Sequence, residues 1–293
     1  MKVVQFTIPV PKKSTVVIQE NIAPHYYNHF HRHQEIQIEF VKSGSGTLIT
    51  GNYMQSFQDG DIYVIGANQP HIFKSDDVYF LPNSEKKIHS LSIFFNPKQL
   101  RETLFLLPEL ESIQKFILGL KNGLQIPENA KELIINTITE LQHAKESIRI
   151  SIFIKLLSQL STLKNPKLLS TTNNEQIISE GEGIRMDHIF QYVVANYKQH
   201  ISLKEISQVA NLTPQAFCRY FKKHTEKTFI EFLNEIRVNE ACKIIVSRQF
   251  ISFADVSAQT GFDNVSNFNR VFKKTILKSP RQYQKEFKNK LRE

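Results

Sequence analysis

Two segments near the C-terminal end carry, at matching positions, side chains that can bond to the bases and phosphates of DNA. The first segment runs from Ile201 to Lys223 and the second from Ile251 to Lys274, with one extra residue in the turn of the second. Arg219 in the first segment matches Arg270 in the second. An arginine can bond O6 and N7 of guanine, and a glutamine such as Gln215 can bond N6 and N7 of adenine. The duplication predicts that one chain contacts two successive stretches of duplex.

Helical periodicity separates an inward face from an outward face in each segment. In the first, Phe217, Tyr220 and Phe221 recur at positions i, i+3 and i+4, which predicts that they face the core. The second segment repeats this spacing with Phe268, Val271 and Phe272. The residues expected to point outward toward DNA are Gln215, Cys218, Arg219 and Lys222 in the first segment and Ser266, Asn269, Arg270 and Lys273 in the second. Base contact competes with phosphate contact for the arginines, whereas phosphate contact or solvation is expected of the lysines.

Turn and capping signals place each outward-facing helix after a shorter one. Asn211-Leu212 is typical of a tight turn, and Thr213 followed by Pro214 is typical of an N-cap and a first helical turn. In the second segment Asp263 or Asn264 can cap the helix. Each segment is therefore interpreted as a helix-turn-helix unit.

Positive charge is concentrated in the same part of the chain. Residues 184–293 hold 19 Lys and Arg residues against 10 Asp and Glu residues, and this surplus of nine equals that of the whole chain. Neutralising phosphates requires a local surplus of this kind. Double-stranded DNA is the expected partner.

Length and composition predict a two-domain protein of the cytoplasm. A chain of 293 residues can form two domains with separate cores. The sequence has no run of about 18 apolar residues and no signal-peptide pattern at its start, so no membrane partner is expected. With only Cys218 and Cys242, a disulfide framework is not expected, and Cys242 lies in an apolar stretch that predicts core packing.

The N-terminal region has the alternation and turns of a small antiparallel structure. Residues 36–41 alternate apolar and polar side chains, Gly44-Ser45-Gly46 marks a turn, and residues 62–65 and 91–95 read as further strands. Short strands at this spacing are typical of a small barrel or sandwich. The first domain is expected over residues 1–165, followed by a polar linker at 166–183 and a second domain at 184–293.

Helical periodicity begins after Asn96, with helices expected at 97–105, 108–120, 128–143 and 147–163. The last of these carries more apolar residues between Ile148 and Leu160 than one helical face needs. Such a helix is either covered on two sides or packs against a second subunit. A homodimer formed through these helices is the expectation.

Residues 186–285 resemble the DNA-binding domain of the AraC/XylS family of bacterial transcription regulators. The stretches that carry the resemblance are Phe217-Cys218-Arg219-Tyr220-Phe221-Lys222-Lys223, Glu235-Ile236-Arg237, Gly261-Phe262 and residues 268–274, followed by Ser279-Pro280 and Tyr283. The resemblance implies two helix-turn-helix units joined by a long helix at about residues 229–247. Glu226 and Leu277 stand where the family often has glycine, and Gln284 where it often has arginine. The first two departures are expected to alter helix C-caps.

Residues 20–95 resemble the cupin-type sensor barrel found in the same family. The match includes His31-Arg32-His33, Gly44-Ser45-Gly46, Gly60-Asp61 and residues 68–71. Metal-dependent cupins use two histidines, a glutamate and a later histidine, and His31, His33 and His71 match three of these positions. Gln37 stands where the glutamate is usual. The three imidazoles could hold Zn²⁺ or Fe²⁺, could bond an organic ligand together with Gln37, or could only cap the barrel mouth.

Other residues near the three histidines are also candidates for the site. His25 and His29 are expected to be bystanders at loop positions, and Arg32 points opposite to His31 and His33 if the strand alternates. The preferred interpretation assigns ligand binding to His31, His33, Gln37 and His71, with no metal and no cofactor. The expected ligand is a small polar metabolite such as a sugar or an organic acid.

These observations predict an α+β multidomain protein. Its N-terminal half would be a cupin-like β-barrel with following helices, and its C-terminal half an all-α domain with two helix-turn-helix units. The expected function is sequence-specific regulation of transcription in response to the effector, without enzyme activity. Activation, with RNA polymerase as a further partner, is the commoner outcome in the family. Two alternatives remain: a cupin metalloenzyme fused to a DNA-targeting domain, which Gln37 disfavours, and an architectural DNA-binding protein without a ligand.

Overall fold

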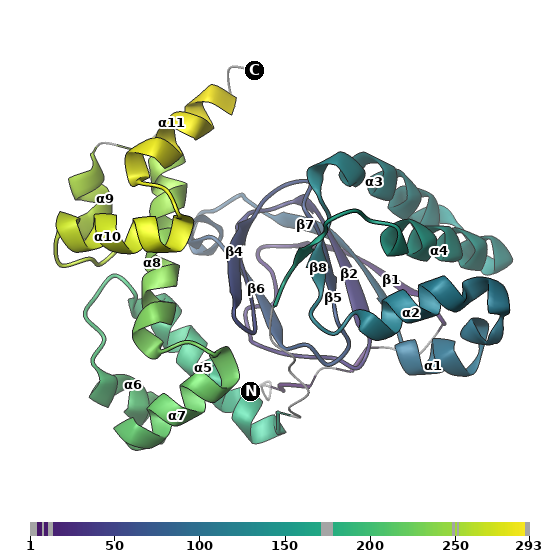
Figure 1. The fold of residues 1–293 in the computed structure, drawn as a ribbon, viewed down its shortest axis with the longest axis horizontal. Coiled ribbons are helices and arrows are strands. Elements are labelled where there is room, and N and C mark those ends of the chain that lie inside the picture. Colours follow the sequence, from purple (N-terminus) through teal and green to yellow (C-terminus); the bar gives the residue numbers. More distant parts are fainter. Residues whose placement is uncertain are drawn as a thin grey trace. The chain divides into compact units, whose positions relative to one another are not determined.

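The structure is a computed structural model that describes residues 5–7, 9–10, 14–170, 178–247, 250 and 252–290. The chain divides into two compact units, Met1–Ile184 and Arg185–Glu293. The strands lie in the first unit, and the second is helical (Figure 1). Ile251, which begins the second repeated segment, lies outside the described residues, as does most of the middle of the expected linker.

The first unit contains two antiparallel sheets. The larger sheet has the order β1 (Val17–Ala23), β7 (Ile88–Phe95), β2 (Ile36–Ser43), β5 (Ile62–Ile65), β8 (Leu124–Gln125) and β9 (Lys167–Leu168). The smaller has the order β4 (Tyr53–Phe57), β3 (Gly46–Thr50) and β6 (His71–Ser75). Between the described strands of the two sheets the ladder is not continuous, although an isolated antiparallel bridge joins His31 to His71. The short strands expected in this region are present as antiparallel sheets, whereas the single closed barrel expected from the cupin resemblance does not form from these pairings.

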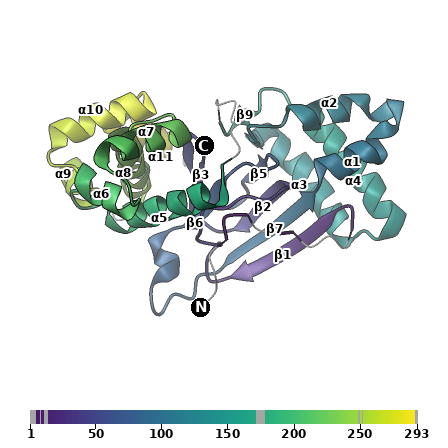
Figure 2. The ribbon, with the colours of Figure 1, turned by 90° about the horizontal axis from the view of Figure 1, so that it is seen from below.

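Four α-helices cover one face of the larger sheet, namely α1 (Pro97–Glu102), α2 (Glu111–Gly119), α3 (Glu128–His143) and α4 (Glu146–Ser161) (Figures 1 and 2). Short 3-10 helices occur at Asp77–Phe80, Leu104–Leu106 and Pro108–Leu110. Successive residues of β2 point to opposite faces. Ile36, Ile38 and Phe40 therefore pack into the core beneath the helices, while the alternate residues Gln37 and Glu39 face the other side.

The apolar residues of α4 are largely used within the unit. Phe153, Leu156 and Leu157 are fully buried in the core shared with the sheet, and Ile150 and Ile154 pack against it half-buried. Ile148 remains 61% exposed. Most of the extra apolar residues in α4 are therefore used in packing on two sides of the helix within the first unit.

Parts of the segment expected to be a linker have regular structure. Lys167 and Leu168 form β9 and pair with β8, and Leu169 is buried in the core of the first unit. The helix α5 begins at Glu180 and runs to Asn196. The carboxylate of Glu180 accepts hydrogen bonds from the backbone N–H groups of Phe6 and Thr7.

The second unit contains the two expected helix-turn-helix units. The first is α6 (Leu203–Val209) with α7 (Pro214–Thr225), and the second is α9 (Phe253–Gln259) with α10 (Val265–Ile276). Between them lies α8 (Phe229–Val246), and α11 (Pro280–Lys290) follows. The long central helix agrees with the range implied by the family resemblance. Tyr220 differs from expectation, since it is half-buried and lies against His224 and Arg185 at its edge.

Both residues that replace the family's glycines stand at helix C-caps in the left-handed conformation. Glu226 after α7 has φ 56° and Leu277 after α10 has φ 62°. Residues with a Cβ atom are strained there. Leu277 is 83% exposed, so little packing compensates for the strain.

Replacing Leu277 with glycine is therefore expected to stabilise the second unit by about 0.5–1 kcal/mol, because glycine adopts this conformation without strain. Urea denaturation of the purified variant measures the change. The matched control is Ile230→Gly, which removes an exposed apolar side chain from a right-handed helical position in α8 and should destabilise. A loss of stability on Leu277→Gly would contradict the strain argument.

Candidate DNA-binding surface and ligand pocket

The helix α7 presents the four residues expected from the first repeated segment on its exposed side. Thr213 accepts a hydrogen bond from the backbone N–H of Ala216, and Pro214 occupies the first turn. Phe217 and Phe221 are fully buried and hold the inner face against α8. The exposed residues are Gln215, Cys218, Arg219 and Lys222. This arrangement allows one helix face to contact base edges and phosphates.

The helix α10 repeats the arrangement. Asn264, rather than Asp263, caps it by accepting a hydrogen bond from Asn267 N–H at 2.8 Å. Phe268 and Phe272 are fully buried, and Val271 is buried with them. The exposed residues are Ser266, Asn269, Arg270 and Lys273. Arg270 Nη2 donates to Asn267 Oδ1 at 2.8 Å, so its guanidinium lies along the exposed face of the helix.

The two turns have the same backbone pattern with different residues. Leu212 N–H donates to Ser207 O at 2.9 Å, and Phe262 N–H donates to Ser257 O at 3.0 Å. The left-handed position is Asn211 in the first turn and Gly261 in the second. At Gly261 a Cβ atom would lie 2.6 Å from Tyr197 O, so only glycine fits. The two repeated segments therefore also share their backbone conformation at the turn.

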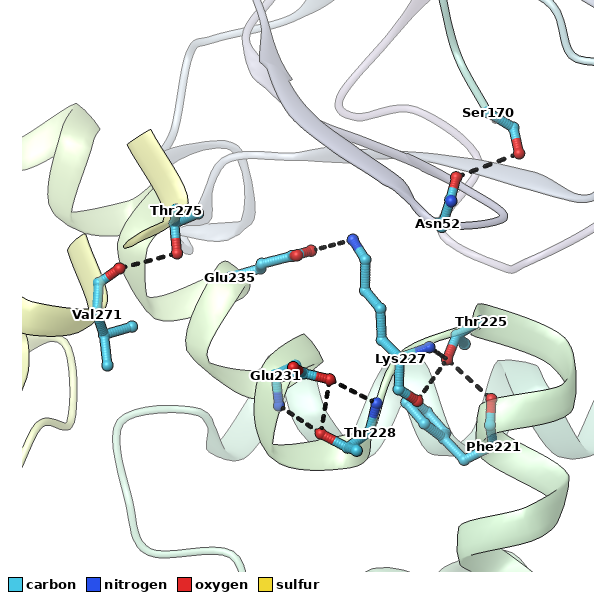
Figure 3. A network of polar contacts seen from close by, with 10 residues as sticks. All are labelled: Asn52, Ser170, Phe221, Thr225, Lys227, Thr228, Glu231, Glu235, Val271 and Thr275. Atoms are coloured by element: carbon cyan, nitrogen blue, oxygen red, sulfur yellow. Dashed lines mark hydrogen bonds and ion pairs between the residues drawn. The ribbon is translucent and has the colours of Figure 1, made fainter. Parts of the chain in front are cut away.

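Polar contacts cluster at the start of α8, and one of them reaches α10. Thr228 and Glu231 form a capping box, drawn in Figure 3. Glu231 also pairs with Lys274 of α10 at 3.5 Å. Lys227 Nζ donates to Glu235 Oε2 at 2.5 Å (Figure 3). Of these contacts only the exposed Glu231–Lys274 pair joins α8 to α10; the others lie within the first turns of α8 and the turn before it.

Arg237 is a positioning residue that the sequence showed only as part of a motif. Its guanidinium donates to Tyr197 O and Gln199 O, each at 2.8 Å, and lies 5.8 Å from the centre of the Phe262 ring. Burial lowers the pKa of Arg237. The side chain fastens the end of α5 to α8 and to the second turn. Local sequence patterns cannot predict these contacts, because the two carbonyl groups lie about forty residues before Arg237 in the chain.

The two cysteines occupy the environments expected from the sequence. Cys218 is exposed on α7, and Cys242 is buried. Burial raises the pKa of the Cys242 thiol to about 12. Cys242 therefore behaves as a small apolar residue of the core around Phe268 and Phe272.

The first unit contains a cavity of about 460 Å³ that brings together the four expected ligand-binding residues. They come from two regions of sequence: His31, His33 and Gln37 precede or lie in β2, and His71 begins β6. The other lining residues among those described include Gln19, Asn21, His25, Tyr26, Tyr27, Glu39, Phe73, Ser90, Ser92 and Phe94. His25 also lines the cavity. Arg32 lies elsewhere, above the ring of Phe6 with Nε donating to Thr7.

The three histidines of the cavity share one hydrogen-bond pattern. Each Nδ1 lies beside a backbone carbonyl oxygen: His31 beside His29 O at 2.8 Å, His33 beside Glu35 O at 2.8 Å and His71 beside Gln69 O at 2.9 Å. A carbonyl oxygen only accepts, so Nδ1 carries the proton and Nε2 carries the lone pair in each neutral ring. Burial lowers the pKa of His33 and holds the pKa of His71 well below its usual value. Burial therefore disfavours the charged form of both rings.

The sequence did not identify the most buried acid of the cavity. Glu39 is 1% exposed; its Oε2 accepts from Gln37 Nε2 at 2.8 Å and from Ser92 Oγ at 2.5 Å. Burial raises the pKa of its carboxyl group. The sequence could have predicted this position of Glu39. Side chains alternate along β2, so a glutamate two residues after Gln37 lies on the same face. His71 Nε2 is buried without a hydrogen-bond partner among the described residues, whereas the hydroxyl groups of Tyr26 and Ser90 lie beside the Glu39 carboxyl group.

These residues also fit the metal that the cupin resemblance implies. One ring nitrogen from each of His31, His33 and His71 lies within 4.8 Å of those of the other two. Metal-binding histidines usually donate their second ring N–H to a carbonyl or carboxylate, as all three do here. Three imidazoles suit Zn²⁺ or Fe²⁺. The cavity can therefore hold either an ion or the polar groups of an organic ligand.

Among the described residues, no helix is both long enough and apolar enough to cross a membrane.

Comparison with known proteins gives matches to both the helical part and most of the chain. A helix-turn-helix domain model matches residues 206–286. Over 265 residues the chain is 23% identical to YdeC, an uncharacterized HTH-type transcriptional regulator of Bacillus subtilis (strain 168), covering 88% of this chain and 87% of that protein. It is 23% identical over 259 residues to the lactose operon transcription activator of Staphylococcus xylosus, covering 87% and 85%. The solved structure of ToxT from Vibrio cholerae O395 aligns with a TM-score of 0.36 at 16% identity, covering 92% of this chain and 97% of that one.

Proposed function

Because the chain belongs to the AraC-type helix-turn-helix transcriptional regulators and binds DNA, we propose that α7 and α10 are its recognition helices. Gln215, Cys218, Arg219 and Lys222 contact one stretch of major groove. Ser266, Asn269, Arg270 and Lys273 contact the next. The observation that carries the proposal is the exposure of both sets on helices whose opposite faces are fully buried. Recognition helices present their side chains to base edges in this way.

Arginine and lysine side chains of α7 are expected to have different roles in DNA binding. Arg219→Ala is expected to weaken binding to the specific site by about 1–3 kcal/mol and to relax base preference there, because a bidentate guanine contact is lost. The matched variant Lys222→Ala, one turn further on, should weaken specific and non-specific binding alike, because a lysine contacts phosphate. Fluorescence anisotropy with an operator duplex and a scrambled duplex measures both. Equal losses on both duplexes for Arg219→Ala would assign it to phosphate instead.

The first unit is proposed to bind a small polar effector in the cavity, through His31, His33, Gln37 and His71. Support comes from the polar side chains that line the cavity and from the buried Nε2 of His71, which would gain a partner from a ligand. Burying a polar group without a hydrogen-bond partner costs about 1–3 kcal/mol. A ligand that bonds to such a group removes this cost, which favours binding in the cavity. We assign the cavity to binding and regulation, not to catalysis.

Effector binding is proposed to change the arrangement of a homodimer and so its contact with DNA. Leu133 of α3 and Ile148 of α4 are more than half exposed and offer apolar surface for the dimer contact. Analytical ultracentrifugation of the full chain reports on the association directly, and a monomer at all concentrations would exclude it.

Activation through RNA polymerase is the proposed outcome, supported by the activator name of the Staphylococcus relative.

A further inference from the structure

We propose that the last helix, α11, is a third DNA-contacting element, whose exposed basic side binds the phosphate backbone of the duplex just beyond the stretch read by α10. The residues that form this side, here called the basic stripe, are Arg281, Lys285 and Lys288. The inference deepens the proposed function and rests on it, because it takes α7 and α10 as the recognition helices. It adds a contact that strengthens binding but carries no sequence information directly.

The spacing of the basic stripe places three cations on one side of α11. Arg281, Lys285 and Lys288 stand at positions i, i+4 and i+7, which fall within about 60° of one another around a helix of 3.6 residues per turn. All three side chains are exposed. From the first cation to the last the helix rises about 10 Å, a length over which each strand of a duplex presents about three phosphates.

The other side of α11 is fixed against the core of the second unit. Pro280 is buried, and Tyr283 and Phe287 are half-buried three and seven residues after it. The ring of Tyr283 lies 5.8 Å from that of Phe272 in α10, and its hydroxyl group forms a hydrogen bond with the Cys242 thiol of α8. The basic stripe therefore keeps one direction, because a rotation of α11 would break its contacts with both α8 and α10.

No acidic side chain neutralises the basic stripe. The only acidic residue of α11 is Glu286, which lies on another side of the helix and pairs with Lys278. Elsewhere in the part of the chain that the structure describes, no carboxylate pairs with Arg281, Lys285 or Lys288. Like charges three and four residues apart destabilise a helix. The stripe therefore lowers the stability of the free protein, and a polyanion lying along it would remove the repulsion.

The position of α11 within the second unit favours duplex DNA as that polyanion. Only residues 277–279 separate α11 from α10. Within the second unit α10 lies between α7 and α11 (Figure 1). A duplex whose successive major-groove segments meet α7 and then α10 therefore continues toward α11. There it presents phosphates, which guanidinium and ammonium groups bind through charge-assisted hydrogen bonds.

The test compares the full chain with the triple variant Arg281→Gln, Lys285→Gln and Lys288→Gln. Glutamine favours the helix about as well as lysine and arginine do, and the inward residues of α11 stay in place. The probe is a duplex that the unmodified chain selects from a random-sequence pool, and fluorescence anisotropy measures its affinity at a series of salt concentrations. We expect the slope of log affinity against log salt to be less steep by about 2.7 for the variant, since each phosphate contact contributes about 0.9. The affinity advantage of the unmodified chain then falls about 40-fold between about 50 and 200 mM salt.

A second triple variant controls for the loss of net charge. Lys87→Gln, Lys98→Gln and Arg101→Gln remove one arginine and two lysines that are exposed on the first unit. This variant should keep the slope of the unmodified chain. Circular dichroism and urea denaturation of both triple variants check that the second unit remains folded.

Duplexes of different lengths locate the contact on the DNA. Base pairs are added to the minimal selected site at one end or at the other, and Arg270→Ala identifies the end read by α10 because it should relax base preference there. The unmodified chain should gain affinity from added base pairs at the α10 end, and the basic-stripe variant should lose this gain. The measurement on the unmodified chain keeps the inference testable if the basic-stripe variant does not fold.

The outcomes separate this inference from the proposed function. An unchanged slope for the basic-stripe variant, or no gain from added base pairs at the α10 end, overturns the inference and leaves the stripe to solvent or to an acidic protein partner. Unaltered base preference in both Arg219→Ala and Arg270→Ala overturns the proposed recognition helices instead. If no duplex is selected, the slopes are compared on a random duplex, where a backbone contact persists. A smaller slope with unchanged base preference supports the inference.

Discussion

Raising the salt concentration from about 50 mM to about 200 mM is expected to weaken DNA binding by residues 184–293 by about 10³- to 10⁵-fold, the loss seen when six to ten phosphates are contacted. The reason is that the whole positive surplus of the chain lies in this region, beside two sets of exposed lysines and arginines. Each phosphate contact releases counterions, and added salt opposes that release.

Fluorescence anisotropy of this fragment on a labelled duplex measures the slope of affinity against salt. Residues 1–183, whose charges balance, are the control and should not bind DNA at any salt concentration. A slope near zero for the C-terminal fragment would show that its affinity does not come from phosphate neutralisation.

Replacing Phe268 with alanine is expected to destabilise the second unit by about 3–5 kcal/mol, because the change leaves a cavity at the centre of its core. Phe268 is fully buried, and its ring lies 5.4 Å from that of Phe262 and 5.6 Å from that of Phe272. A loss of this size is a large part of the stability of a domain of this length. DNA binding through α10 should therefore be lost at ordinary temperatures.

Urea denaturation followed by circular dichroism measures the loss. Phe253→Ala is the matched control, since this phenylalanine is only half-buried at the start of α9 and should cost less than half as much. Equal losses for the two variants would mean that the core around Phe268 relaxes to fill the cavity.

The helices α7 and α10 could be predicted from local signals because both faces are encoded within a few residues. Thr213 with Pro214 marks one start, and Asp263-Asn264 marks the other, where the structure shows that Asn264 is the cap. The phenylalanines at positions i and i+4 define the buried face, and the outward residues follow by elimination. Tyr220 departs from this rule, since it is half-buried with its ring against His224 and Arg185.

The cavity was only half predictable. The histidines and Gln37 were recognised through a family pattern, but His25, Tyr26 and Ser90 come from a loop and from a strand that no short pattern links to them. Arg32 and His31 are neighbours in sequence, yet the backbone turns Arg32 toward Phe6 and away from the cavity. Whether the strands close into one barrel depends on pairings between distant residues, and here the described pairings form two sheets.

The sequence by itself determined the helix-turn-helix duplication, the faces of α7 and α10, the concentration of positive charge and the Thr213 cap. These are properties of residues close together along the chain, where a period of 3.6 and a few turn signals suffice. Only the tertiary structure decided that Arg237 joins α5 to the second turn, that α4 is covered within its own unit, and that Glu39 lies behind Gln37 and the three imidazoles. Each of these depends on hydrogen bonds or packing between segments tens of residues apart, whose meeting follows from the folded chain as a whole.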